Sequence, residues 1–386
     1  MSRSHFVSLP LAAALFAFAL PAQGQGIRLT TGVDGGVIYQ YDPLFLPPTG
    51  ITVEAWVTFD DSTMPTGNYY WPTIARQNVT PNQESWNFRV SSGNANSRSL
   101  QFIIRTQTNQ LFNATYNFAA GEFVGFTHLA GTFDGTNIRI FKNGVQVATN
   151  AVPALSEIVN NGGELRVGNG DPVAPGREAW NGIIDELRIW PMARSAAEIT
   201  ATMNQQLWFM PGGVLEFDFD NSLNEFSHNI VGTSFGTVNF APGQTLTLGA
   251  PTTSVLGVPS STCARTAEIA LGSLPQTGNS AFRLWCVRGP RPANSSLGLL
   301  VAALAPAPAA QPPVLGVNLA FSLTSVITTV ALIPPTNPLG NAQFNLPVPN
   351  NPGLVGVTMI FQFGFSDTQC GAQGFSAGTG LSMAFQ

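Results

Sequence analysis

Two adjacent carboxylates, Asp185 and Glu186, stand in the apolar stretch that ends at Trp190. Hydrolysis of a glycosidic bond needs two carboxyl groups that flank the scissile bond. Successive side chains of a β-strand point to opposite faces, so we expect Asp185 and Glu186 to lie on opposite sides of a sheet. Neither Glu-x-Asp-x-x-Glu nor Glu-x-Asp-x-Glu occurs. These residues therefore argue against a glycosidase, and we predict a protein that is not an enzyme.

The sequence gives little support to catalysis by histidine, to zinc binding or to phosphate binding. Only His128 and His228 follow the N-terminal segment, and we expect both to be structural. The cysteines are far apart and no His-x-x-x-His occurs, which argues against zinc. Glycine-rich stretches such as the one at Gly278 lack the strand–loop–helix setting of a phosphate-binding loop.

Aromatic residues in loop-like segments are the remaining candidates. Tyr69, Tyr70, Trp71 and Trp86 stand in such segments of the first half. Sugar rings stack well on tyrosine and tryptophan faces, so we predict these four as ligand-binding residues. The alternative is that Trp71 and Trp86 cover the core beneath a long loop.

Three cysteines, Cys263, Cys286 and Cys370, all lie in the second half. An exported protein meets an oxidising compartment, where one disulfide is expected and one thiol is left over. Three pairings are open. We favour Cys263–Cys286, because the turn-like stretch 274–279 lies midway between them.

The N-terminus has the features of a signal peptide. Arg3 is followed by the apolar run Leu9–Leu20, and small residues allow cleavage after Ala22 or Gly24. We therefore expect residues 1–24 to be removed and the protein to be secreted or held at the cell surface. The apolar run is too short to span a bilayer comfortably.

Composition narrows the class further. The chain has 386 residues, a net charge of −5 and only 10% charged residues. No basic run exceeds a pair, which argues against nucleic acid and against an anionic membrane surface. Abundant glycine and proline favour strands and turns. We predict an all-β protein with two domains.

The first half is a series of strands, turns and one helix. Apolar residues alternate along 51–59, and the Asp134-Gly135 and Asn143-Gly144 turns bracket further strands, which predicts a meander. Ser195 and Glu198 have the spacing of a capping box, and good helix formers follow over 196–207.

The second half has a different composition. Residues 213–250 form a transition that either supplies an outer strand of the first domain or is the relic of a second copy. Residues 251–386 hold few charges. The apolar segment 314–333 is rich in β-branched residues and predicts paired strands rather than a membrane span, and 357–366 alternates as a strand with one aromatic face. We predict a smaller β-sandwich here.

Four motifs of the first half occur in a fixed order: ITVEAWV, HLAGTFDGTNIRIFKNGVQV, LRVGNG and WNGIIDELRIWPMARSAAEI. In this order they resemble the laminin G-like family. The resemblance implies a concanavalin A-like β-jelly roll over residues 25–212. The C-terminal motifs GNSAFRLWCVRG, LPVPNNPGLVGVTMIFQFGFSD and FSAGTGLSMAF resemble a small β-domain at the ends of exported planctomycete-like and myxobacterial proteins, which implies a bacterial origin.

The laminin G-like resemblance also implies one structural calcium ion at the rim. The matching positions are Asp34 and Asp185, and hard oxygen ligands suit Ca²⁺. At Gly36 and Val37 the sequence lacks the second acidic residue that is common in the family. The alternative is that Asp34 makes a turn and Asp185 accepts backbone hydrogen bonds.

The predicted function is recognition of a glycan or a cell-surface partner without catalysis. Two alternatives stay open: a structural surface protein without a ligand, and a jelly-roll polysaccharide hydrolase or lyase. Binding predicts aromatic and polar side chains that converge on one concave surface.

Overall fold

The structure is a computed structural model, and it describes residues 24–30, 34–62, 70–78, 83–94, 97–153, 155–170, 178–207, 210–225, 227–248, 253–256, 267–291, 295–309, 311–332, 336–337, 339–369 and 374–386. Residues 1–23 of the predicted signal peptide, Tyr69, Cys263 and Cys370 lie outside these ranges. Among the described helices, none has the length and apolar character that a membrane crossing needs.

One sheet of the first domain has eight strands in the order β10-β9-β8-β3-β12-β1-β16, with β14 paired to β12. Its strands alternate core residues with residues on the outer face, as the period of a half-buried strand requires. The bounds are β1 Gln25–Leu29, β3 Ile51–Val57, β8 Thr127–Phe133, β9 Asn137–Lys142, β10 Val145–Ala151, β12 Gly182–Trp190, β14 Leu215–Phe217 and β16 Asn239–Pro242.

The second sheet of this domain has seven strands in the order β15-β2-β11-β4-β5-β6-β7. The bounds are β2 Gly35–Tyr39, β4 Thr73–Asn78, β5 Trp86–Asn94, β6 Ser97–Arg105, β7 Leu111–Asn117, β11 Glu164–Val167 and β15 Gly232–Gly236.

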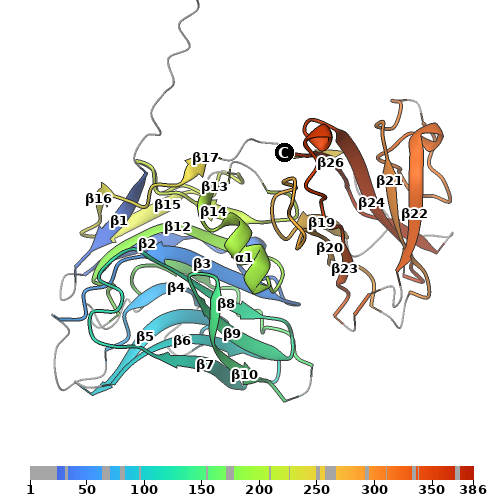
Figure 1. Ribbon diagram of the computed structural model, residues 1–386. Coiled ribbons are helices and arrows are strands. Elements are labelled where there is room, and N and C mark those ends of the chain that lie inside the picture. Colours follow the sequence, from blue (N-terminus) through green and yellow to red (C-terminus); the bar gives the residue numbers. More distant parts are fainter. Residues whose placement is uncertain are drawn as a thin grey trace, which may run out of the picture.

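A large apolar core joins the two sheets. Val53 of β3 and Phe88 of β5 are fully buried members of one cluster to which strands of both sheets contribute. Figure 1 shows the two sheets as curved layers, one over the other. The all-β, concanavalin A-like jelly roll is therefore confirmed. The meander around the Asp134-Gly135 and Asn143-Gly144 turns is confirmed as well, as β8, β9 and β10.

The predicted helix is present but shorter than expected. Helix α1 spans Ala196–Thr202, and Ser195 and Glu198 form the predicted capping box. From Thr202 on, carbonyl oxygens accept hydrogen bonds from groups outside the helix. Arg188 donates to the carbonyl oxygens of Thr202 and Gln205, at 3.2 and 2.5 Å.

The transition segment completes the jelly roll. Strands β14 and β16 pair with β12 and β1 of the eight-stranded sheet, and β15 pairs with β2 of the seven-stranded sheet. This corresponds to the outer-strand alternative. The short strands β13 Gln205–Gln206 and β17 Thr247–Leu248 pair in parallel beside it.

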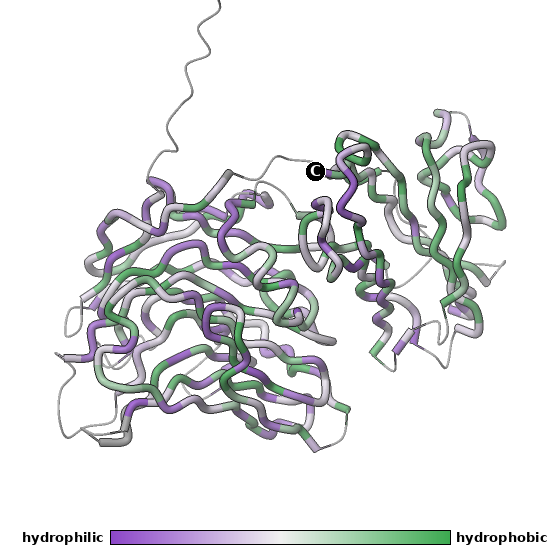
Figure 2. Tube along the Cα trace, viewed as in Figure 1, coloured by the Kyte–Doolittle hydropathy of each residue, from purple (hydrophilic) through white to green (hydrophobic). Residues whose placement is uncertain are grey.

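The C-terminal half is a smaller sandwich of a six-stranded and a three-stranded sheet. In Figure 2 its strands carry longer hydrophobic stretches than those of the jelly roll. The six-stranded sheet consists of β18 Thr253–Leu256, β21 Gly298–Ala303, β22 Val326–Leu332, β24 Thr358–Ser366, β25 Phe375–Ala377 and β26 Gly380–Ala384. The three-stranded sheet consists of β19 Glu268–Leu271, β20 Arg283–Val287 and β23 Ala342–Asn345. Within the described ranges, 3-10 helices span Pro43–Phe45, Leu323–Ser325 and Pro352–Leu354.

Two sequence predictions for this half meet different outcomes. Strand β24 is confirmed, with Phe361, Phe363 and Phe365 buried on one face. Only the last part of the predicted strand pair 314–333 is a regular strand, β22; the part before the 3-10 helix makes isolated bridges.

The two domains pack against each other through a shared apolar cluster. Trp190 and Met192 of the jelly roll belong to the same buried cluster as Leu284 of β20. Arg194, which is fully buried, also crosses this boundary: its Nε donates to the carbonyl oxygen of Gly272 at 2.9 Å. This contact fixes the two sides of the cleft described next.

Candidate functional site

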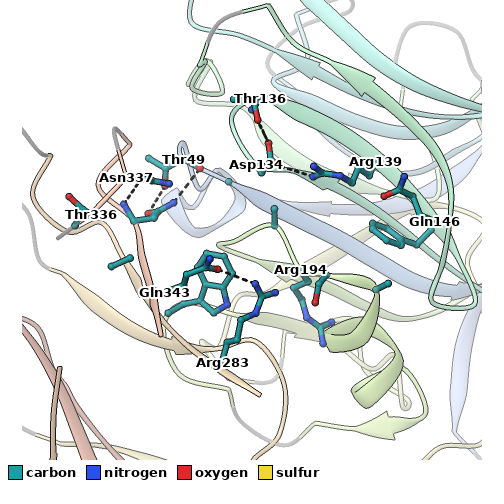
Figure 3. A pocket seen from close by; sticks show the side chains of 18 of the residues that line it. Thr49, Asp134, Thr136, Arg139, Gln146, Arg194, Arg283, Thr336, Asn337 and Gln343 are labelled. Atoms are coloured by element: carbon teal, nitrogen blue, oxygen red, sulfur yellow. Dashed lines mark hydrogen bonds and ion pairs between the residues drawn. The ribbon is translucent and has the colours of Figure 1, made fainter. Parts of the chain in front are cut away.

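A polar cleft of about 790 Å³ lies where the two domains meet. Figure 3 shows its jelly-roll side, with Asp134, Arg139 and Gln146, facing Arg283 and Gln343 of the C-terminal domain. Thr49, Ser195, Thr336, Asn337 and Asn341 add hydroxyl and amide groups, and Phe141 and Trp285 add aromatic rings.

The jelly-roll wall is built by the turn between β8 and β9. Asp134 Oδ1 accepts hydrogen bonds from the backbone N–H groups of Thr136 and Asn137, at 2.9 and 2.7 Å, and Gly135 has a φ of 93°. Asp134 Oδ2 binds Arg139 Nη1 at 2.6 Å. Partial burial raises the pKa of Asp134, but the hydrogen bonds from Arg139 and Thr136 outweigh it and lower the pKa below its usual range.

The opposite wall is built by β20 and β23. Arg283 binds the Glu198 carboxylate of α1 through Nε, at 2.9 Å, and through Nη2, while its Nη1 donates to Gln343 Oε1 at 3.0 Å. Trp285 Nε1 donates to Glu198 Oε1 at 3.2 Å, and the Arg283 guanidinium lies 5.0 Å from the Trp285 ring. Burial raises the pKa of Glu198, but the bonds from Arg283 outweigh it and lower the pKa.

The charges of the cleft are therefore matched inside the protein. Asp134 pairs with Arg139, Glu198 with Arg283, and Arg194 with the buried Glu54. Thr49, Ser195, Thr336 and Asn341 also bond within the protein. What the cleft offers a ligand is therefore the Gln146 and Gln343 amides with an aromatic ring, and no large excess of either charge. Gln146 and Gln343 are exposed, so their amides are accessible from solvent.

The four predicted aromatic residues do not form one surface. Trp86 is fully buried in the jelly-roll core, where its Nε1 donates to the carbonyl oxygen of Phe45 at 2.8 Å. Trp86 is a core residue and not the surface aromatic that we predicted, because a buried ring has no face for a sugar. Tyr70 is 8% exposed, and Trp71 is half-buried with Arg89 5.6 Å from its ring.

The two predicted calcium ligands bind different partners. Asp34 Oδ1 accepts a hydrogen bond from Asn169 at 2.9 Å. Both Asp185 oxygens accept backbone N–H groups, from Glu186 at 2.9 Å and from Gln244 at 2.7 Å. No group of three or more His, Cys, Asp or Glu side chains converges among the described residues. The described side chains do not fit a calcium ion shared by Asp34 and Asp185.

The two adjacent carboxylates do not take opposite faces, contrary to our expectation. The β3–β12 register shifts between Asp185 and Arg188, and Glu186 has a φ of 50° at this bulge. The Glu186 carboxylate binds Arg188 Nη2 at 2.7 Å. Burial, with Glu186 nearby, raises the pKa of Asp185 to about 8. Both side chains are buried, away from the cleft.

Cys286 of β20 is fully buried and forms no disulfide with another described residue, and burial raises the pKa of its thiol. Its predicted partner, Cys263, lies outside the described residues, so the pairing stays a prediction.

The sequence analysis assigned no binding role to any residue of the cleft, although it predicted the Asp134-Gly135 turn and the Ser195 helix cap, which line it. It also passed over Gly232–Gly236, which has the Gly-x-Ser-x-Gly spacing of serine hydrolases. That spacing acts in a strand–turn–helix setting. Here it forms strand β15, and Ser234 is exposed within that strand. His228 precedes this strand in the sequence, and the partner of its Nδ1 is Glu225 Oε1, at 3.3 Å.

Comparison with known proteins agrees with the architecture. Residues 30–200 match a laminin G family model described as the concanavalin A-like lectin/glucanases superfamily. The match covers most of the jelly roll; strands β1, β14, β15 and β16 and the C-terminal domain lie outside it. Comparison with curated protein sequences gave no match.

Several solved structures resemble the jelly roll. A Bacteroides ovatus protein, proposed to bind carbohydrate, is 16% identical over 59% of this chain and 61% of its own length, with a TM-score of 0.43. A heptameric pentraxin of Limulus polyphemus is 11% identical over 59% of this chain and 98% of its own, with a TM-score of 0.39. The CBM40 of a Ruminococcus gnavus sialidase, bound to α2,3-sialyllactose, is 16% identical over 46% and 96%, with a TM-score of 0.33. These low values carry no conclusion about what this chain binds.

Proposed function

We propose that the chain is an exported, non-catalytic recognition protein that binds a neutral glycan in the cleft between its domains. The observation that carries this proposal is the lining of the cleft: two exposed glutamine amides and an indole, with the charged groups already paired. Sugar hydroxyls need such donors and acceptors, and the C–H face of a sugar ring packs on an aromatic ring. The family description of residues 30–200 as lectin- and glucanase-like is in line with this.

Two features support the absence of catalysis. Asp134 is the carboxylate that lines the cleft in the described part of the chain, and Arg139 occupies one of its oxygens. Glycoside hydrolysis needs a second carboxyl group across the scissile bond.

The proposal of export rests on the apolar run Leu9–Leu20 and the small residues after it.

The test is a glycan-array screen of the purified secreted chain, followed by titration of any retained glycan. Gln146 and Gln343 reach the cleft from opposite domains and are exposed, so Gln146→Ala and Gln343→Ala should each weaken binding about 5-fold to 50-fold. Gln110→Ala is the matched control, because Gln110 is also exposed and lies outside the cleft. No retained glycan, or equal losses in all three variants, would favour the structural alternative.

The same material tests calcium. Repeating the array and a thermal melt in EGTA should change neither the glycan signal nor Tm, because Asp185 uses both oxygens for backbone hydrogen bonds. A lower Tm in EGTA would restore the calcium prediction.

A further inference from the structure

Strand β22 is an edge strand of the six-stranded sheet, and β21 is its one neighbour among the described strands. Figure 1 shows it as the outermost strand of this sheet. Residues 326–329 and Ala331 are exposed, and the exposed side chains of Val326 and Ile327 are apolar. Within the described part of the chain, no other segment forms a hydrogen bond with the backbone of β22. The N–H and C=O groups along its outer edge are therefore open to a further strand.

Two edge strands of the jelly roll have the same length as β22, but they cover each other. Strands β7 and β10 close the same side of the two stacked sheets and lie in contact. Asn150 Nδ2 of β10 donates to the carbonyl oxygen of Asn113 of β7 at 2.8 Å. Proteins protect edge strands by such cover, by charged side chains or by proline. Strand β22 has neither a charge nor a proline, and the register shift against β21 at Ile327 is its irregularity.

The surface around β22 has no charge that could select a partner of opposite sign. Residues 292–366, which include β21 to β24, contain no Asp, Glu, Lys or Arg. The exposed side chains of Leu304 and Leu323 add apolar surface near the start of β22, where the Leu304 N–H donates to the carbonyl oxygen of Ser325 at 3.1 Å. What this edge offers is therefore backbone hydrogen bonds and apolar contact.

A second copy of this chain fits such an edge. When two identical strands pair antiparallel about a twofold axis, the residue at the axis lies opposite its own copy. A charged strand would thus bring like charges together, which is unfavourable, whereas an uncharged strand pairs with itself without repulsion. Pairing centred on Thr329 places threonine opposite threonine and Ile327 opposite Ala331 of the second copy. Both are pairs that a sheet accommodates well.

We propose that two copies of the chain form a symmetric dimer by antiparallel pairing of their β22 strands, which joins the two six-stranded sheets into one. Leu332 is buried and borders the cleft, so the pairing is confined to residues 326–331. An interface of this size is weak, and dimerisation therefore depends on concentration. The dimer carries two interdomain clefts. A repetitive glycan would gain avidity from them, a consequence that rests on the proposed function.

Sedimentation velocity of the full secreted chain, in reducing buffer and without glycan, tests the dimer. The reducing buffer excludes disulfide-linked pairs. Between about 1 and 200 µM the wild-type chain should change from monomer to dimer, as a Kd in the micromolar range requires. Thr329→Lys places two positive charges opposite each other and should weaken dimerisation about 10-fold or more. Thr115→Lys is the matched control, because Thr115 is an exposed threonine of the edge strand β7, and it should leave the Kd unchanged.

A monomer throughout this concentration range overturns the proposal, as does growth into large aggregates without a discrete dimer. Equal weakening in Thr329→Lys and Thr115→Lys also overturns it, because added charge alone would then be the cause. A dimer that persists in Thr329→Lys is formed by another surface and contradicts pairing through β22. If Thr329→Lys fails to fold, Ile327→Lys replaces it, because the Ile327 side chain is exposed. Since no glycan is present, failure of the glycan proposal leaves these outcomes unaffected.

Discussion

The outer faces of the two jelly-roll sheets differ in the partners of their buried polar side chains. On the eight-stranded sheet, helix α1 and the C-terminal domain cover the face, and the buried arginines there are paired with carboxylates, although His128 Nδ1 and Thr132 Oγ1 have no hydrogen-bond partner among the described residues. Glu54 binds Arg194 at 2.7 and 2.8 Å and accepts from Trp190 Nε1, while Arg188 binds both Glu186 and Glu216. On the seven-stranded sheet, the Asn87 amide has no hydrogen-bond partner among the described residues, and Arg89 bonds to the uncharged Gln101.

The difference separates two uses of buried polar groups. A closed network holds two structural units in register, because removing any member leaves another buried charge alone. An unpaired buried group instead carries an energetic cost, because its lost hydration is not replaced. Buried polar groups therefore stabilise the fold or weaken it according to their partners.

The largest expected loss of stability comes from removing one arginine of the buried ion pairs on the eight-stranded sheet. Arg194→Met should lower the free energy of unfolding by about 3–5 kcal/mol, because Glu54 is left buried and unpaired and the bond to Gly272 across the domains is lost. Urea unfolding measures it. Arg28→Met, which removes an exposed arginine of the same sheet, should change stability by less than about 0.5 kcal/mol.

If Arg194→Met and Arg28→Met lowered the free energy of unfolding equally, the buried ion pairs on the outer face of the eight-stranded sheet would not be what stabilises this face. A double variant with Glu54→Gln sharpens the point. Because the unpaired charge is then removed, the double variant should lose less than the sum of the two single losses.

His128, on the outer face of the eight-stranded sheet, makes the stability of the protein depend on pH. It is buried against Trp56, with 5.3 Å between ring centroids, and burial lowers its pKa to about 4 despite the nearby Glu54. From pH 6.5 down to 4 the unfolded state binds this proton and the folded state does not. Stability therefore falls as the pH is lowered through this window, by up to roughly 3 kcal/mol.

Comparing the pH dependence of unfolding for the wild type and His128→Phe isolates this contribution, because phenylalanine keeps the ring against Trp56. Asp185, whose pKa is raised to about 8, gives a slope of opposite sign between about pH 4 and 8, so the difference between the two chains is the quantity to read. Parallel curves would contradict a neutral, buried His128.

How far the sequence leads depends on the range of the interaction. The Asp134-Gly135 turn, the Asn143-Gly144 turn and the capping box at Ser195 are short-range features, and all three were predicted. The second role of Glu198, which binds Arg283 of the other domain, joins residues 85 positions apart. No local pattern encodes that contact, so the cleft could not be found from spacing.

Burial of aromatic residues was equally hard to predict. Trp71 and Trp86 both stand near turn-forming residues, but Trp86 begins a strand whose register directs it into the core. Register is set by pairing with β4 and β6, which are defined only in the fold. The bulge at Glu186 changed the face of a carboxylate for the same reason.

A substitution on the outer face of the seven-stranded sheet should have a smaller effect, and it should raise the free energy of unfolding. Asn87→Leu should raise the free energy of unfolding by about 1–2 kcal/mol in the absence of ligand, because it removes a buried amide that has no partner within the described residues. Thermal and urea unfolding measure the gain. A loss of stability would show that Asn87 is satisfied in solution, and the contrast between the two faces would disappear.

The smallest expected effect concerns an ion pair at the rim between the domains. Arg291 binds Glu157, and their side chains are 41% and 25% exposed. Water and salt screen such pairs, so Arg291→Gln should cost only about 0.2–1 kcal/mol, and added salt should reduce the difference. Urea unfolding of the two chains at low and high salt measures this. A loss as large as that of Arg194→Met would mean that the rim, rather than the buried network on the covered face, holds the two domains together.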